Sequence, residues 1–186
     1  MKKSWAIKNM LYPLPAVMVS CGANEQEHNI ITVSWTGIVC SVPLMCYISV
    51  RKERHSHAII KKNGEFVINL TNQDLTFAMD WCGVKSGKNV DKFKEMGLCK
   101  EIAQQVQAPL IAEAPVNIEC KVVEIKELGS HDMFLAEIVA INVDDKYIDN
   151  ETNSFDLSKA HLIHYSGGSY FSQGEFLGKF GFTSNQ

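Results

Sequence analysis

Short runs rich in β-branched residues dominate the first half of the chain and predict strands. Four runs stand out, at residues 16–21, 30–35, 44–50 and 65–70. The first two flank a polar stretch, residues 22–29, and are typical of a strand, a loop and a second strand. A short helix is expected before the fourth strand, with Ser56 as its N-cap and Asn63 and Gly64 at its end.

The second half of the chain adds strands and two short helices. Residues 116–122 alternate between apolar and polar positions and predict a half-buried strand. Residues 127–132 are expected to form a loop, and residues 133–143 a strand that crosses the core. Helices are expected at residues 71–80 and 90–96. Strands joined by short loops, with few helices, favour an antiparallel barrel over a parallel doubly wound sheet.

The composition is that of one ordinary globular domain. Of the 186 residues, 46% are hydrophobic and 21% are charged, which is enough to bury a core without disulfides. Neither an internal repeat nor a linker-like stretch divides the chain, so a single domain over residues 1–186 is expected. The formal net charge of −3 leaves no broad basic field, which argues against nucleic acid as the main partner.

The N-terminus resembles a signal peptide only superficially. Lys2 and Lys3 precede a partly apolar stretch, but Lys8, Asn9 and two prolines interrupt it, and a signal peptide needs roughly 7–15 uninterrupted apolar residues. The chain also has no apolar run long enough to cross a bilayer. We expect a cytoplasmic protein without a membrane partner, and a secreted protein is the less favoured alternative.

The six cysteines show neither a CxxC pair nor the spacing of a zinc knuckle. Cys40 and Cys46, separated by five residues, fit neither a zinc ribbon nor a redox motif. His161 and His164 are three residues apart, but a third metal ligand is not evident. We therefore expect free buried thiols in a reducing compartment and no metal site.

The two arginines of the chain, Arg51 and Arg54, lie in one short segment where a strand passes into a helix. A helix start offers free backbone N–H groups, and the arginine fork matches phosphate oxygens. Ser56 adds a hydroxyl to the same corner. The segment is a candidate phosphate site, and the alternative is a solvated charged loop.

A second candidate lies at residues 29–36. Along a strand, Thr32, Ser34 and Thr36 share one face next to Trp35. A row of hydroxyls beside a large ring can hydrogen-bond the heteroatom edge of a planar ligand. On periodicity alone, an ordinary exposed strand face is the favoured interpretation.

The remaining candidates are a histidine and an aromatic tail. His131 lies beside Asp132 in a predicted turn, where a plain surface role is the usual one. Residues 162–182 carry six aromatic side chains among five glycines, namely Tyr165, Tyr170, Phe171, Phe176, Phe180 and Phe182. This tail is expected to cap a planar ligand, to pack on a second subunit or to wrap over its own barrel.

Several familiar catalytic motifs are absent from the sequence. There is no GxSxG, no HExxH and no GxxxxGK[ST], and no GxGxxG follows a strand. Nucleophilic hydrolases, zinc peptidases, P-loop enzymes and Rossmann dehydrogenases are therefore disfavoured. A phosphate corner without phosphate-transfer machinery indicates a phosphate-bearing cofactor that is held as a whole.

Short motifs follow one another in order over nearly the whole chain. They are Pro15-Ala16-Val17-Met18-Val19-Ser20, Asn29-x-x-Thr32-x-Ser34-Trp35, Val42-Pro43-Leu44, Ser49-Val50-Arg51 with Ser56, Glu65-Phe66-Val67-Ile68-Asn69-Leu70, Ser86-Gly87 with Asp91-Lys92-Phe93, Gly129-Ser130-His131 and Tyr165…Gly167-Gly168-x-Tyr170. Each motif is weak alone, but together they resemble the flavin reductase-like FMN-binding domains, most of all the flavoredoxin branch.

The resemblance implies a mainly β fold, a split β-barrel of Greek-key type with a few short flanking helices. It also implies a homodimer with FMN at the interface. His131 corresponds to a histidine near flavin and nicotinamide, although this chain has Ser130-His131-Asp132 where many relatives have Asp-His-Thr. The implied set is His131 as catalytic residue and, for the cofactor, Asn29, Thr32, Val33, Ser34, Trp35, Ser49, Val50, Arg51, Lys52, Arg54, Ser56 and Lys92.

The function implied is that of an oxidoreductase. It would take electrons from NADH or NADPH and pass them through FMN to flavin, iron or a redox protein partner. One alternative is a non-enzymatic FMN electron carrier, and another is a flavin-free split-barrel binding module. The sequence does not separate these three functions.

Overall fold

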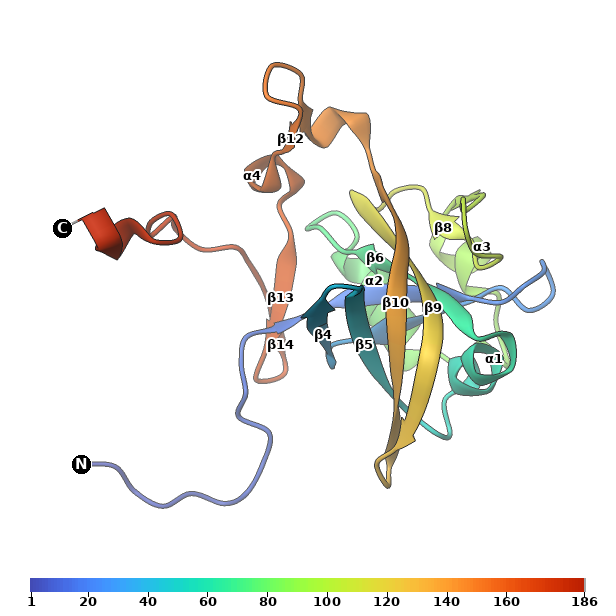
Figure 1. Ribbon diagram of the computed structural model, residues 1–186. Helices are drawn as coiled ribbons and strands as arrows, with labels where there is room; N and C mark the ends of the chain where they lie inside the picture. Colours follow the sequence, from blue (N-terminus) through green and yellow to red (C-terminus); the bar gives the residue numbers. More distant parts are fainter. Residues whose placement is uncertain (186) are drawn as a thin grey trace.

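The computed structural model describes residues 1–185 of the 186, and strands dominate it (Figure 1). The strands are β1 (Leu14–Pro15), β2 (Val17–Cys21), β3 (Asn29–Val33), β4 (Thr36–Ser41), β5 (Leu44–Arg51), β6 (Glu65–Leu70), β7 (Lys100–Glu101), β8 (Leu110–Ile111), β9 (Val116–Glu127), β10 (His131–Val143), β11 (Ile148–Asp149), β12 (Ser154–Phe155), β13 (Ile163–Ser166) and β14 (Ser169–Ser172). The helices are α1 (His55–Asn63), α2 (Thr76–Val84), α3 (Lys92–Met96) and α4 (Leu157–Ala160), with 3-10 turns at Asp145–Tyr147 and Phe182–Asn185.

A short connection forces the main sheet to curl. Seven antiparallel strands pair in the order β3-β2-β6-β9-β10-β5-β4, so β3 and β4 lie at opposite edges of the sheet. Only Ser34 and Trp35 separate these two strands in the chain, and the steps from Val33 to Thr36 reach at most about 11 Å. A flat sheet of this kind would be about 29 Å wide. The sheet therefore closes into a barrel, and the antiparallel barrel expected from the sequence is confirmed.

The place where β3 passes into β4 is the seam of this barrel. At this place, the backbone N–H of Ser49 in β5 donates to the carbonyl oxygen of Trp35 (2.9 Å), which extends the β4–β5 ladder by one residue. The strand expected at residues 30–35 ends instead at Val33, and β4, which the sequence analysis did not predict, begins two residues later. The break exists because the chain changes sheet edges there.

Two hydrophobic cores hold β2 and β3 in place. Val19 of β2 points into the barrel among side chains such as Phe66 and Phe134. Met18, on the other face of β2, packs outside the barrel in a second core with residues of α2 and α3. Every residue of β2 is buried, so the strand beside the seam is fixed from both sides.

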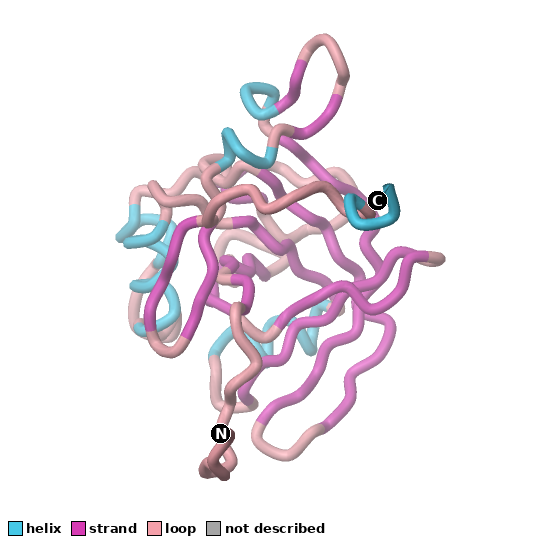
Figure 2. Tube along the Cα trace, turned by 90° about the vertical axis from the view of Figure 1, so that its left-hand side faces the viewer, coloured by secondary structure: helices cyan, strands magenta, loops and turns pink. Residues whose placement is uncertain are grey.

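The helices begin at residues other than those expected. The first residue of α1 is His55 and its N-cap is Arg54, so Ser56 lies buried in the first turn instead of capping it. α2 begins only at Thr76, because Asn72 accepts the Leu75 N–H (3.1 Å) in a turn ahead of the helix. In Figure 2 the helices lie around the rim of the strand framework. Within residues 1–185, none of them is long and apolar enough to cross a membrane.

The loop expected at residues 127–132 is shorter in the structure. β9 continues to Glu127 and β10 begins at His131, which leaves residues 128–130 as the connection. His131 therefore opens a strand and does not lie in a turn. Its Cα partner across the sheet is Arg51 at the end of β5, so two of the candidate residues are neighbours.

Both chain ends leave the barrel on the same side (Figure 1). β1, β13 and β14 form a separate three-stranded sheet, in which Tyr165 and Tyr170 pack against the second core. Beyond β14, Phe176, Phe180 and Phe182 are exposed. The expectation that the aromatic tail wraps over its own barrel is therefore wrong for these residues.

Candidate functional site

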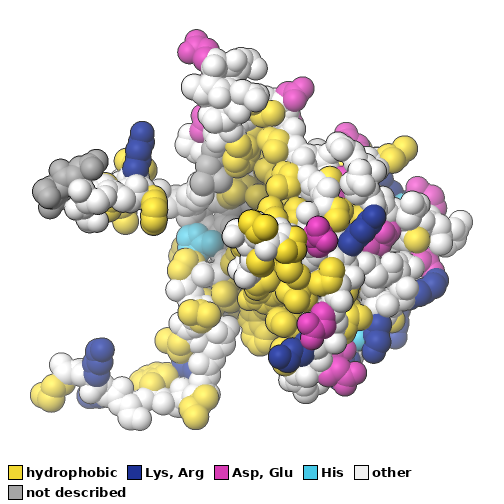
Figure 3. Space-filling model, viewed as in Figure 1, with side chains coloured by type: hydrophobic (Ala, Val, Ile, Leu, Met, Phe, Trp, Pro, Cys, Tyr) yellow, Lys and Arg dark blue, Asp and Glu magenta, His cyan; other side chains and the backbone are white. Residues whose placement is uncertain are grey.

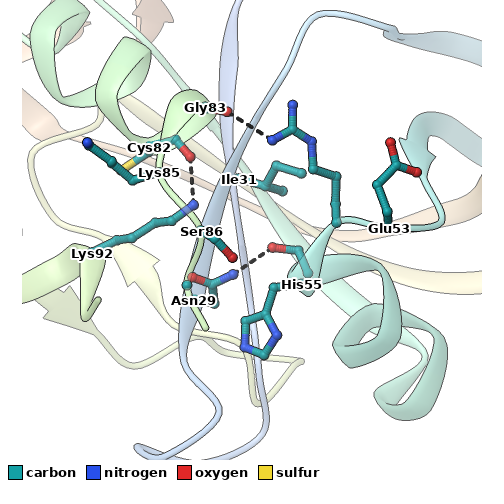
Figure 4. A pocket seen from close by; sticks show the side chains of 12 residues that line it. Asn29, Ile31, Glu53, His55, Cys82, Gly83, Lys85, Ser86 and Lys92 are labelled. Atoms are coloured by element: carbon teal, nitrogen blue, oxygen red, sulfur yellow. Dashed lines mark hydrogen bonds between the residues drawn. The ribbon is translucent and has the colours of Figure 1, made fainter. Parts of the chain in front are cut away.

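Two adjoining cavities bring most of the candidate residues together. The first has a volume of about 290 Å³ and lies between β3, the start of α1 and residues 82–92 (Figure 4). The second has a volume of about 360 Å³ and lies along the seam of the barrel. Ile31 and Arg54 line both cavities, so the two form one continuous surface. Sites for small molecules usually measure about 300–1,000 Å³, so a sizeable ligand would occupy both.

The first turn of α1 forms one wall of the first cavity. Asn29 Nδ2 donates to Ser56 Oγ (2.8 Å), and both side chains are buried (Figure 4). The Ser56 oxygen accepts this bond, so its hydroxyl hydrogen can donate either to the neighbouring Cys21 sulfur or to a ligand. In the described chain, no side chain caps this helix start. The His57 N–H already donates to the Arg54 carbonyl, so only the N–H groups ahead of it are left as donors.

Lys92 brings a buried cation to the same cavity. Its Nζ donates to the carbonyl oxygens of Ile30 (2.7 Å) and Cys82 (2.6 Å), and the residue is only 4% exposed. An ammonium group has three donors, so one remains for a ligand. Burial lowers the pKa of Lys92, and the nearby Arg54 cation acts in the same direction. Arg54, Lys85 and Lys92 line this cavity against one carboxylate, that of Glu53, so the lining carries a net positive charge that favours an anion.

The basic residues at the end of β5 and directly after it have different surroundings. Arg54 lines both cavities and donates to the Gly83 carbonyl (3.3 Å). Arg51 lines only the second cavity, with its guanidinium 3.6 Å from the Glu53 carboxylate. Lys52 lies outside the linings of both cavities and contacts Glu127 (3.2 Å) and Asp132 (3.3 Å). The structure therefore does not bring Lys52 to either cavity, and it places Arg51 at the second cavity only. The sequence-based assignment of both residues to a phosphate stays a prediction.

Aromatic rings and backbone line the second cavity. Trp35 and His131 form a tilted stack, with ring centroids 4.6 Å apart, and Tyr165 of β13 joins the lining. Val33, Ser49 and Val50, which the sequence analysis assigned to the cofactor, also line it.

The row of hydroxyls expected at residues 29–36 is only partly present. Thr32 and Ser34 line the second cavity, but the Thr32 hydroxyl donates to the Met79 carbonyl. Thr36 is buried and its hydroxyl donates to the Tyr47 carbonyl (2.6 Å), away from the cavity. The prediction that Thr36 shares a face with Thr32 and Ser34 is therefore wrong, because the seam turns the chain between them.

His131 is oriented by its chain neighbour. Ser130 Oγ lies 2.9 Å from His131 Nδ1, which leaves Nε2 for a ligand. Burial lowers the pKa of His131, and the Arg51 cation lowers it further. The shift favours the neutral imidazole, which suits hydrogen bonding more than charge pairing.

Some lining residues were not assigned a role from the sequence. His55, Lys85 and Ser86 line the first cavity, and Gly87 packs so closely that an added Cβ would lie 2.1 Å from Asn29 Oδ1. The tight approach explains why a glycine follows Ser86. The Ser86-Gly87 pair is the one signal in the sequence that could have found this wall.

Comparisons with known proteins identify the family and the fold. The family model described as flavin reductase like domain matches residues 10–171. An uncharacterized protein of Pyrococcus abyssi is 31% identical over 131 residues, which cover 70% of this chain and 74% of that protein. The structure of flavoredoxin of Desulfovibrio vulgaris (Miyazaki F) is similar over 100% of both chains, with a TM-score of 0.90 and 30% identity. That of flavoredoxin from Methanosarcina acetivorans covers 99% of this chain and 98% of its own, with a TM-score of 0.89 and 25% identity. The chain belongs to the flavin reductase like family and has its split β-barrel fold.

Proposed function

We propose that the protein binds FMN across the two cavities and passes electrons from NADH or NADPH through it to flavin, iron or a protein acceptor. Family membership supports a flavin-related oxidoreductase function in general. The observation that supports FMN in particular is that the cationic first cavity and the aromatic second cavity share Ile31 and Arg54. A ligand with a phosphate at one end and a planar ring at the other matches this pair.

The first cavity fits a phosphate group by the chemistry of its donors. The Ser56 hydroxyl, the third N–H of Lys92 and the start of α1 are hydrogen-bond donors, as a phosphate dianion requires. Arg54, which lines both cavities, adds a guanidinium group with several N–H donors where the cavities meet. Asn29 orients the Ser56 hydroxyl by donating to its oxygen.

The second cavity fits a planar ring with a polar edge. Trp35 and Tyr165 offer flat apolar surfaces, and backbone groups at the seam can hydrogen-bond ring heteroatoms. When bound, FMN supplies hydride and electron transfer, which no side chain of the protein can perform. Arg51 places a positive charge at this cavity, where it stabilises negative charge on a reduced ring.

His131 is the proposed catalytic residue. Its neutral imidazole lies in the wall of the ring cavity, with Nδ1 occupied by Ser130 and Nε2 left for a nicotinamide amide. This role is to orient the donor and not to transfer a proton. A flavin carrier fed by another redox protein would have no use for it, so His131 favours the reductase over the carrier.

A homodimer with FMN at the interface completes the proposal. Hydrophobic side chains gather on the face over β4, β5 and β10 (Figure 3), and Ile38, Val39 and Val42 are among the exposed ones. The exposed aromatic tail extends from the barrel and could cover a second copy. A cytoplasmic location accords with six free cysteines, since a reducing compartment keeps thiols unpaired.

The visible absorption spectrum of the purified protein tests the function. It is recorded before and after anaerobic addition of NADH, and separately of NADPH. Flavin bands that bleach support the reductase and identify its donor, whereas bands that persist support the electron carrier. If added FMN fails to bind, the flavin-free binding module becomes the better function.

A further inference from the structure

A cluster of three charged or titratable side chains lies behind the two cavities. The Asp132 side chain is only 1% exposed, and its Oδ2 accepts from His57 Nε2 at 2.8 Å. Its Oδ1 lies 3.3 Å from Lys52 Nζ, which also contacts Glu127. The His57 ring packs edge-on against Phe134 in the barrel core, with centroids 5.2 Å apart. A carboxylate can only accept hydrogen bonds, so the proton on Nε2 is fixed in this pair.

Each member of this cluster follows a cavity-lining residue in the chain. Lys52 follows Arg51, His57 follows Ser56, and Asp132 follows His131. Arg51 and His131 line the second cavity, the proposed ring cavity. Ser56 lines the first cavity, the proposed phosphate cavity. Along β10, successive side chains point to opposite faces, so His131 faces the cavity while Asp132 faces the core. The cluster therefore joins the three segments from the side that a ligand does not touch.

We infer that Asp132, acting through His57 and Lys52, is a positioning residue that fixes the phosphate cavity relative to the ring cavity. The inference rests on the proposed function, because it concerns a ligand that fills both cavities at once. The Asp132–His57 bond ties the first turn of α1 to the start of β10. The Lys52 contact ties the end of β5 to the same carboxylate.

Two arguments support this role: the chemistry of the buried Asp132–His57 pair, and the way a ligand held at both ends binds. A buried ionic pair adds little to stability compared with apolar residues of the same size, so specificity of geometry is its better-attested use. A ligand that is held at both ends loses affinity when the distance between its two subsites fluctuates, because binding must then reduce the conformational freedom of the protein. A ligand that fills one cavity alone does not depend on that distance.

The experiment compares FMN with riboflavin, which lacks the phosphate. Binding of each to the Asp132→Asn and His57→Gln variants is measured by flavin fluorescence. We expect FMN affinity to fall about tenfold or more, the usual effect of losing an outer support of a site, while riboflavin affinity changes little. A Lys52→Met variant, which leaves the buried pair intact, is expected to show a smaller loss in the same direction.

The matched control removes a different tie on the same helix. Lys62 and Asn63, at the far end of α1, both contact the Glu27 carboxylate, so Glu27→Gln weakens the attachment of that end. This variant should bind both flavins as the unaltered protein does. Thermal unfolding of every variant identifies any loss of fold, and the Lys52→Met result stands if the buried variants fail to fold.

The outcomes separate the two proposals. Equal loss of FMN and riboflavin affinity in Asp132→Asn, or no loss of either, would overturn the positioning role. An FMN loss as large in Glu27→Gln would overturn it too. If the unaltered protein binds neither flavin, the proposed function fails first, and the positioning role fails with it.

Discussion

The indole of Trp35 stacks on the imidazole of His131, with ring centroids 4.6 Å apart and planes inclined by 31°. Trp35 lies at the barrel seam and His131 at the start of β10, so the stack joins two segments nearly a hundred positions apart in the sequence. Both residues line the second cavity, and in the stack each ring covers one face of the other. An outer ring face of such a stack offers a surface on which a planar ligand can pack.

Replacing His131 with asparagine should affect the electron donor more than FMN. We expect kcat/KM for NADH or NADPH to fall about tenfold, the equivalent of one lost hydrogen bond, with FMN affinity changed far less. Because the pKa of His131 lies below its usual value of about 6.5, the imidazole is neutral above that pH. The rate should be constant between about pH 7 and 8 and change below about pH 6.5 only in the unaltered protein. An unchanged kcat/KM in the variant would remove His131 from the site.

Replacing Arg54 with alanine should weaken FMN but not riboflavin. The lost interaction with phosphate is a charge-assisted hydrogen bond, expected to contribute about 1.5–3 kcal/mol. Lys61→Ala is the matched control, since it removes an exposed positive charge from the far end of α1. Fluorescence titrations of both flavins check the prediction. Equal effects of the two substitutions would mean that only overall charge matters.

Arg51→Ala, at the ring cavity, should weaken the two flavins alike.

Replacing Gly87 with alanine should damage the phosphate cavity by steric pressure. The added Cβ would lie 2.1 Å from Asn29 Oδ1, so Asn29 must move and its bond to Ser56 is lost. Overpacking of this kind costs about 1–3 kcal/mol of stability. Gly174→Ala is the control, because an added Cβ there meets no described atom within 4 Å. Urea unfolding and FMN titration should separate the two variants, and similar values for both would contradict the close packing.

Replacing Asp132 with asparagine should make stability less dependent on pH. Burial opposes ionisation of Asp132, but the hydrogen bond from His57 and the nearby Lys52 cation outweigh it, so its pKa lies below the usual value. Such a carboxylate stabilises the fold fully above its unfolded pKa of about 3.9, and the stabilisation is lost as the pH falls through the folded pKa. The variant should therefore be less stable by about 1–3 kcal/mol at pH 7, with the difference shrinking below about pH 4. Urea unfolding across this range tests the sign, and a constant difference would contradict it.

Replacing Phe176 and Phe180 together with serine should shift the dimer towards monomer. Both side chains are exposed beyond β14, and burial in a second copy would stabilise the dimer by about 1.5–3 kcal/mol each. Light scattering at micromolar concentration measures the mass. The unaltered protein should have the mass of two chains, and a monomer mass would defeat the proposed dimer. Replacing Lys179, which lies between them, with serine is the control.

The sequence predicted the strands well because their residues must be apolar wherever a face is buried. β6 was expected with its observed bounds, and β9 and β10 were expected with shifted ends. β4 was missed because its exposed side chains, such as Ile38, do not alternate with polar ones. The break at Ser34 is a consequence of barrel closure, and no local pattern encodes it.

Local sequence predicted that residues cluster at the strand-to-helix corner, but not where each side chain points. Arg54 and Ser56 of this corner line one cavity together with Asn29 from the other candidate segment. Lys52 belongs to the same run of charges, but Asp132 and Glu127, distant in the sequence, hold its side chain elsewhere. Such a long-range contact is invisible in one sequence, so the surroundings of a charge could not be inferred from its neighbours.

The seam has a consequence for how the site tolerates sequence change. In the described chain, β3 pairs only with β2 and β4 only with β5, which leaves main-chain donors and acceptors along the edges that face each other. Every residue except proline offers the same backbone groups. In the proposed function, these main-chain groups can therefore hydrogen-bond a ring whatever side chains the strand-edge residues carry. This accords with a fold kept at a TM-score of 0.89 with only 25% identity.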